Sequence, residues 1–200
     1  GQQPAITAMV GAASSNAIAQ TATASIEAGD AAALAAVAQK LQAAKDAYVA
    51  QNQPYGKYSI DMVAAANKID IKVTGSSAHG SRPEEGVNPV PRLALFLQQT
   101  LLADAKPLVQ ANQYSSALRY ITGVYGLDYF GKGLGLAYAD DFMGPLTISP
   151  NFIKPANGQL EVTANARMPR GKTPEQLKAE VEKGIANWSA AANVPVKIDY

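Results

Sequence analysis

The sequence predicts an α+β fold in which antiparallel sheets carry helices on one face. Short alternating runs at residues 69–73 and 160–166 have the two-residue period of strands with one buried face. Helical stretches stand between groups of strands, without the strict strand–helix alternation that builds a parallel, doubly wound sheet. The order of elements instead fits two ferredoxin-like halves in succession.

The first half is expected to span about residues 1–105. Residues 31–50 are rich in alanine and carry larger apolar side chains at helical spacing, and Asp30 supplies a start signal, so this is the longest predicted helix. A second helix is expected from about Val90, because the prolines beside it are tolerable in a first helical turn. The predicted strands of this half are 5–12, 21–28, 58–65 and 69–73.

The second half, together with an insertion, is expected over residues 106–200. Residues 111–142 are rich in tyrosine and glycine but hold few basic residues, which favours a packed insertion with short helices over a stacking surface for single-stranded nucleic acid. Thr173 and Pro174 fit the cap and first position of a last helix. The predicted strands here are 146–149, 160–166 and 194–200, with 150–158 joining the first two as a hairpin-like pair.

Composition limits the classes of partner and location. The 200 residues carry a net charge of only +1, so neither nucleic acid nor an anionic membrane is expected as a partner. No apolar run approaches the roughly 18 residues needed to cross a bilayer. The chain has no cysteine, which excludes disulfides and thiolate metal sites and fits a periplasmic or secreted bacterial protein better than a cytoplasmic one.

The single histidine of the chain, His79, lies in a glycine-rich loop between a predicted strand and a predicted helix. A lone histidine is more often a surface or satisfied residue than a catalytic one. Loops held by a rigid scaffold are, however, the usual place for reactive side chains. The neighbours of His79 decide between these interpretations: residues 75–88 read GSSAHGSRPEEGVN.

This run resembles the signature that opens the lid-domain helix of M20-family metallopeptidases, particularly the monomeric dipeptidases of the PepV and carnosinase-like type. The similarity covers about a dozen consecutive positions. It implies that residues 1–200 form the lid domain of such an enzyme, built from two ferredoxin-like halves. In the monomeric members of the family, the second half stands in for a partner subunit.

The resemblance also implies roles for individual residues. His79 matches the lid histidine that donates a hydrogen bond to the developing oxyanion. Arg167, in Asn-Ala-Arg-Met-Pro, matches the arginine that grips a substrate carboxylate, and its alternative role is an ion pair on the polar sheet face. Asn16, in Asn-Ala-Ile-Ala, resembles a substrate-facing asparagine, although alanine replaces the usual proline and a plain turn residue is equally compatible. Asn151 is a further substrate-binding candidate, in a loop that is expected to line the cleft.

The chemistry of the parent enzyme is expected to lie outside this chain. M20 enzymes hydrolyse amide bonds with one or two zinc ions, which need several converging nitrogen and oxygen ligands. One histidine and no His-x-Asp pair cannot supply that set, and Glu84-Glu85 is interpreted as a solvated turn. No metal or cofactor is therefore expected in this chain; zinc is expected in a catalytic domain that is its partner, along with a short peptide substrate. The chain is expected to be a monomer or a weak dimer, and inert alone.

Two other classes of function stay open. A freestanding ferredoxin-like module could serve binding or oligomerisation through its sheet edges, but it would not need a histidine in a glycine-rich loop. An RNA-binding fold of similar topology would need aromatic residues on its central strands. Residues 69–73 and 160–166 contain none, so this alternative ranks low.

Overall fold

The largest element of the fold is a four-stranded antiparallel sheet, seen in a computed structural model that describes residues 3–11, 14, 16–52 and 56–200. Its strands are β1 (Ala5–Val10), β3 (Thr21–Glu27), β4 (Ser59–Ala64) and β5 (Lys68–Thr74), in the order β1-β3-β5-β4. All four strands were predicted, and β4 pairs with β5, its neighbour in the sequence. The first prediction ran to residue 12, which lies outside the described residues.

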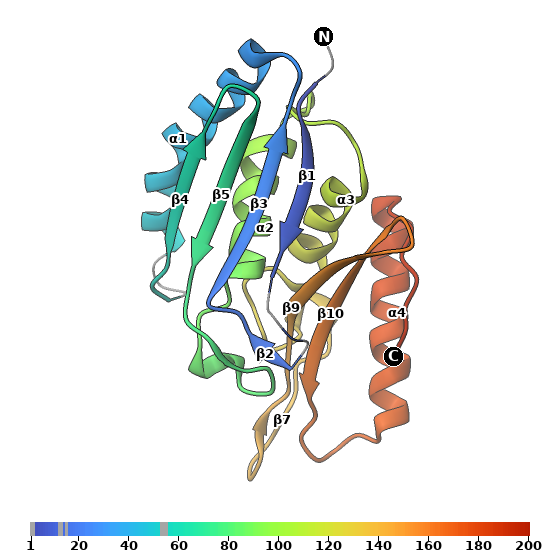
Figure 1. Cartoon of the computed structure of the whole chain (residues 1–200). Coiled ribbons are helices and arrows are strands. Elements are labelled where there is room, and N and C mark those ends of the chain that lie inside the picture. The colour runs from blue at the N-terminus through green and yellow to red at the C-terminus, as the bar shows by residue number, and fades with distance from the viewer. Residues whose placement is uncertain (1–2, 12–13, 15, 53–55) are drawn as a thin grey trace.

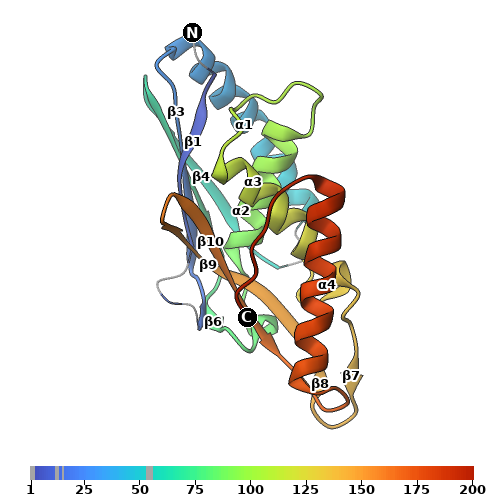
Figure 2. The same cartoon turned by 90° about the vertical axis from the view of Figure 1, so that its right-hand side faces the viewer.

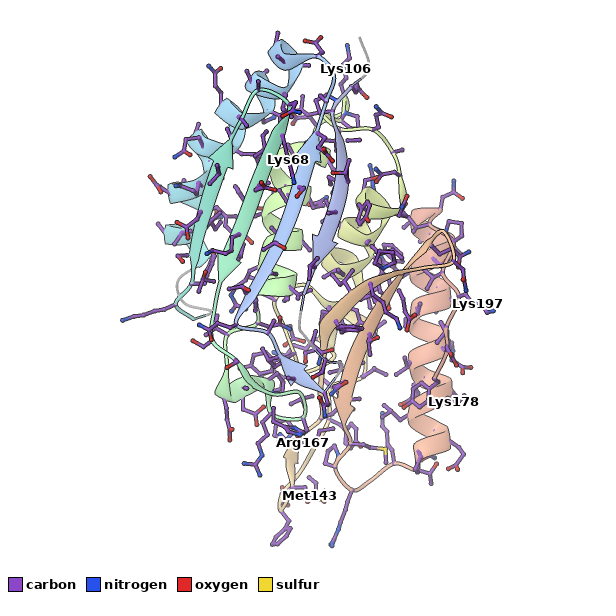
Figure 3. The ribbon with its side chains drawn as sticks, viewed as in Figure 1. Lys68, Lys106, Met143, Arg167, Lys178 and Lys197 are labelled. Carbon is purple, nitrogen blue, oxygen red and sulfur yellow. The ribbon has the colours of Figure 1, made fainter. Side chains whose placement is uncertain are left out.

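The register of the sheet explains its two faces. β3 and β5 pair in phase, from Thr21 opposite Thr74 to Glu27 opposite Lys68. Alternate positions therefore point the same way on both strands. The buried set is Ala22, Ala24, Ile26, Ile69, Ile71 and Val73. The charged side chains of β5, such as Lys68, lie on the opposite face and are exposed (Figure 3).

Helices cover only the buried face of this sheet (Figures 1 and 2). They are α1 (Ala31–Asn52), α2 (Pro89–Leu97), which continues as a π-helical segment over Gln98–Leu102, and α3 (Gln113–Tyr120), which continues likewise over Ile121–Tyr125. Asp30 begins α1 as predicted, because its Oδ1 accepts the N–H groups of Ala32 and Ala33 at 3.0 and 3.2 Å. The predicted α+β arrangement, antiparallel sheets with helices on one face, is confirmed. Its division into two ferredoxin-like halves stays a prediction.

A long hairpin and a helix form the second part of the chain (Figure 1). The hairpin pairs β9 (Thr147–Ala156) with β10 (Gln159–Arg167) and is followed by α4 (Pro174–Ala192). The hairpin was predicted, but most of the expected joining segment, 150–158, belongs to β9. The turn itself is Asn157-Gly158, both with positive φ (51° and 76°), which suits a two-residue hairpin. Pro150 and Pro155 are tolerated in this strand because, among the described residues, β9 pairs on one side only.

The prediction of a last strand over residues 194–200 is wrong. α4 ends at Asn193 in the left-handed conformation (φ 56°), and residues 194–200 pair with no strand in the described part of the chain. Apolar residues at alternate positions of this segment serve packing instead. Val194 is buried, and Val196 and Ile198 pack against the cluster that α4 helps to form.

Two hydrophobic clusters hold the fold together. The first lies between the four-stranded sheet and α1, α2 and α3, and it extends along the chain to Ile121 and also includes Ile153. The second joins α4 to the hairpin and to residues 121–146. The predicted insertion does contain short helices, including a 3-10 turn at Lys132–Leu134, and then a small ladder of β7 (Ala139–Asp140) and β8 (Gly144–Pro145). No helix within the described ranges is long and apolar enough to span a bilayer.

Candidate functional site

The loop that carries His79 is closed at its base by backbone hydrogen bonds. Ser76 and Val87 exchange two of them, at 2.9 and 2.8 Å. A glycine is required beside this bridge: a Cβ on Gly75 would lie 2.0 Å from the carbonyl oxygen of Val87. The loop is therefore pinned where it leaves the sheet, and its interior holds β6 (Ala78–His79) and a 3-10 turn at Pro83–Glu85.

His79 is positioned by its main chain and oriented by a near neighbour. β6 pairs with β2 (Ala17–Ile18), so that Ala17 lies opposite His79. The side chain is exposed, and its Nδ1 lies 2.7 Å from Ser81 Oγ and 3.1 Å from the backbone nitrogen of Ser81. The imidazole thus stands at the surface on a fixed backbone, as a donor aimed at a ligand must.

Asn16 lies next to this turn. Its carbonyl oxygen accepts the backbone N–H of Gly80 at 2.9 Å, and its side-chain oxygen accepts the hydroxyl of Ser14 at 2.7 Å. The structure therefore brings together two of the predicted residues, His79 and Asn16, although 63 positions separate them in the sequence. The side chain of Asn16 is exposed.

Arg167 reaches the same loop from the end of β10. Its Nη1 lies 3.2 Å from Oε1 of Glu84, in the 3-10 turn that follows His79. An ion pair on the sheet face was the alternative role predicted for Arg167, and Arg167 does form an ion pair. Its partner, however, belongs to the histidine loop rather than to a neighbouring strand. Figure 3 shows Arg167 at the end of the molecule opposite Lys106.

Asn151 is placed by a β-bulge and does not reach the surface. Thr163 pairs with Phe152 and Ala164 pairs with Pro150, so Asn151 is the extra residue of β9. It is 0% exposed, and its Nδ2 donates to the carbonyl oxygen of Ala17 at 3.0 Å. Asn151 therefore supports β2, the strand that pairs with His79, from the inside.

Three residues of this site were not singled out from the sequence. Asn165 lies against Gly80, and a Cβ on Gly80 would lie 2.3 Å from its Nδ2. Glu84 was interpreted as part of a solvated turn, but it is the ion-pair partner of Arg167. Ser81 contacts the imidazole of His79. Asn165 lies two residues before Arg167 on the strand, and Ser81 lies two residues after His79 in the turn. This short spacing was the signal in the sequence that could have identified both residues.

The described residues contain no group of three or more His, Cys, Asp or Glu side chains that could hold a metal ion. The donors that do gather at this end are an imidazole, a guanidinium and amides. Such groups can bind a carboxylate and a carbonyl oxygen that gains negative charge.

Comparison with known proteins identifies two similarities. The family model described as the peptidase dimerisation domain, of the M20 group, matches residues 65–190. The Beta-Ala-Xaa dipeptidase of Lactobacillus delbrueckii subsp. lactis is 29% identical over 144 residues, which cover 72% of this chain and 28% of that protein. The chain thus spans less than a third of the length of this curated relative.

Proposed function

Since this chain belongs to the M20 family of peptidase dimerisation domains, we propose that it is the substrate-binding lid of a zinc-dependent dipeptidase. The observation that carries the proposal is the meeting of three distant segments: β2 pairs with β6 at His79, Asn16 bonds to Gly80, and Arg167 bonds to Glu84. The similarity to a dipeptidase supports a hydrolase as the parent protein. Short peptides are the proposed substrates.

In this proposal His79 is a catalytic residue that donates a hydrogen bond to the oxyanion. As the peptide carbonyl is attacked, its oxygen gains charge, and a positioned donor stabilises the transition state by about 3–4 kcal/mol. The exposed ring on a pinned loop supports this role. The zinc would be held by the catalytic domain of the parent, where it would polarise the carbonyl and activate water.

Arg167 is proposed to bind the C-terminal carboxylate of the peptide. A guanidinium has five N–H donors, so one ion pair to Glu84 leaves donors for a second carboxylate. The ion pair also orients the long side chain before the substrate arrives, which reduces the entropy lost on binding. Arg167 is 29% exposed in its side chain, so a ligand can approach it while part of the group is already shielded from water.

The two asparagines have different proposed parts. Asn16 is exposed beside the His79 turn, where its side chain could contact the peptide. Asn151 is buried, and it contributes by holding β2 through the carbonyl of Ala17. The proposed partners are therefore the catalytic domain of the parent protein and a short peptide, with a bacterial periplasmic or secreted setting, and the chain acts as a monomer or weak dimer.

The proposal is tested by comparing two proteins in one dipeptidase assay. The full-length parent, loaded with zinc or manganese, should hydrolyse free dipeptides, and residues 1–200 alone with the same metals should not. Metal-dependent turnover by the isolated chain would contradict the lid role. A full-length protein that cleaves no short peptide would instead favour the alternative, a module for binding or oligomerisation.

A further inference from the structure

We propose that Ser81 is a positioning residue that holds the neutral imidazole of His79 in its Nε2–H form. Two donor groups of Ser81 converge on one ring atom. The hydroxyl Oγ lies 2.7 Å from Nδ1, and the backbone N–H points at the same Nδ1 from 3.1 Å. Nothing in the resemblance to M20 enzymes assigns a role to this serine.

The backbone contact decides which nitrogen carries the proton. A peptide N–H can only donate, so Nδ1 of His79 must offer its lone pair to Ser81. A neutral imidazole has one N–H and one lone pair, and the proton is therefore on Nε2. The hydroxyl of Ser81 can rotate, so it adds a second donor to Nδ1 in this form.

The contact also fixes the direction of the ring. The His79 side chain is exposed, and neighbouring elements hold its backbone rather than its imidazole. Ser81 is itself held in a tight turn, because the N–H of Arg82 donates to the carbonyl oxygen of His79 at 2.9 Å. The turn from His79 to Arg82 thus contains the residue that orients the ring.

The consequence for catalysis rests on the proposed function. Nε2 is the ring nitrogen on the far side from Ser81, and with its hydrogen it is a donor for an oxyanion. The opposite tautomer would present a lone pair to a negatively charged oxygen, which repels it. Ser81 acts here through His79 and has no proposed contact with substrate.

The test uses the fact that the chain has one histidine, so its ring nitrogens give one set of signals in a ¹⁵N NMR spectrum. In alkaline buffer, wild-type residues 1–200 should show an unprotonated Nδ1 and a protonated Nε2. Ser81→Ala removes the hydroxyl but keeps the backbone N–H, so it should shift the Nδ1 signal while the proton stays on Nε2, and Ser81→Thr should restore the wild-type spectrum. Ser77→Ala is the matched control in the same loop, because the contact of Ser77 with Gln20 uses its backbone N–H.

Kinetics of the full-length parent give an independent readout. Ser81→Ala should lower kcat by about threefold to tenfold, the range set by one hydrogen bond, with KM unchanged and with recovery in Ser81→Thr. A wild-type spectrum with the proton on Nδ1, or a Ser81→Ala spectrum and kcat equal to wild type, would overturn the inference. If the spectra behave as expected but His79→Ala leaves kcat unchanged, the positioning by Ser81 stands and the proposed function fails.

Discussion

Arg167 and Glu84 are 83 positions apart in the sequence, yet Nη1 of the arginine lies 3.2 Å from Oε1 of the glutamate. The pair ties the end of β10 to the loop of His79. It is partly exposed, with side chains 29% and 36% accessible, so its own effect on stability is small. Its importance is geometric, because it places the guanidinium beside the loop that carries the imidazole.

Replacing Arg167 by lysine in the parent should impair hydrolysis of a free dipeptide. Lysine keeps the charge but loses the planar fork that binds a carboxylate through two bonds. Complete loss of a desolvated charge pair costs about 2–5 kcal/mol in transition-state binding, which is the upper limit for a variant that keeps the charge. A C-terminal amide substrate, which lacks the carboxylate, should be little affected. The measurement is kcat/KM for both substrates.

Glu84→Gln is the control for that experiment, because it breaks the same ion pair without removing the guanidinium. Since Glu84 orients the guanidinium, this variant should slow the free dipeptide less than Arg167→Lys does, and it should leave the amide nearly unchanged. If Arg167→Lys slowed both substrates equally, Arg167 would be a structural partner of Glu84 and not the carboxylate ligand.

His79→Ala in the parent should lower kcat by about 10²–10³-fold, the cost of one oxyanion donor. The zinc content should stay at the wild-type level, because the proposed role of His79 lies outside the metal ligands. Metal analysis of the purified variant accompanies the kinetics. Parallel loss of zinc and activity would show that His79 is a ligand or a folding residue.

Gly80→Ala should destabilise the fold and displace the His79 turn. The new Cβ would lie 2.3 Å from Nδ2 of Asn165 and 3.0 Å from the backbone of Asn16, and the backbone cannot move without disturbing β2. Overpacking of this kind costs about 1–3 kcal/mol in the free energy of unfolding, measured by urea denaturation.

Gly29→Ala is the matched control, because a Cβ at Gly29 meets no atom within 4 Å. It should leave the unfolding free energy nearly unchanged. Adding Asn165→Ala to Gly80→Ala should recover part of the loss, since the two changes share one contact. Equal unfolding curves for Gly80→Ala and Gly29→Ala would mean that the loop accommodates a side chain there.

Alkaline pH should destabilise the chain through Tyr125. Burial raises the pKa of Tyr125 well above its ordinary value, and the neighbouring Tyr120 raises it further. The folded state therefore holds this proton more tightly than the unfolded state. The associated stability is present below about pH 10 and is lost as the pH rises above it, by up to about 1.4 kcal/mol per pH unit.

Urea denaturation across that range measures the effect, and Tyr125→Phe should flatten the pH dependence. The variant should also lose about 1 kcal/mol at neutral pH, because the hydroxyls of Tyr120 and Tyr125 share a hydrogen bond of 3.0 Å. Tyr200→Phe removes an exposed tyrosine and should change neither result. If the unfolding free energy of Tyr125→Phe fell with pH as steeply as that of the wild type, groups other than Tyr125 would be responsible for the loss of stability at alkaline pH.

The sequence predicted the regular elements better than the irregular contacts. The period of apolar residues in β5 and α1 is a local property, and it predicted the type of both elements and the face that each one buries. The strand predicted at residues 194–200 was wrong, because alternate apolar residues can be buried without a strand partner, and Val196 packs against the cluster that α4 helps to form. The length of β9 was underestimated for a related reason, since sequence alone does not show how far the two strands of a hairpin stay paired.

Parts of the site were predictable only as separate motifs. His79 and Arg167 stand in patterns that can be read locally, and the structure brings their segments together. The contact of Asn165 with Gly80 depends on how the hairpin packs beside the His79 loop, which no local pattern determines. The burial of Asn151 depends likewise on a bulge, a one-residue change in pairing that leaves no mark in the alternation of β9.

The hydrogen bond from Asn151 to Ala17 links residues 134 positions apart, so we expect the site to form late in folding. A fragment that ends before β9 could keep the four-stranded sheet and most of the first core, but β2 would lose its inner support. Local opening of the hairpin in the intact chain would have the same effect. The amides of β2 and β6 should therefore be protected from hydrogen exchange to the same degree as the amides of β9, rather than to the degree seen in the four-stranded sheet from which they extend.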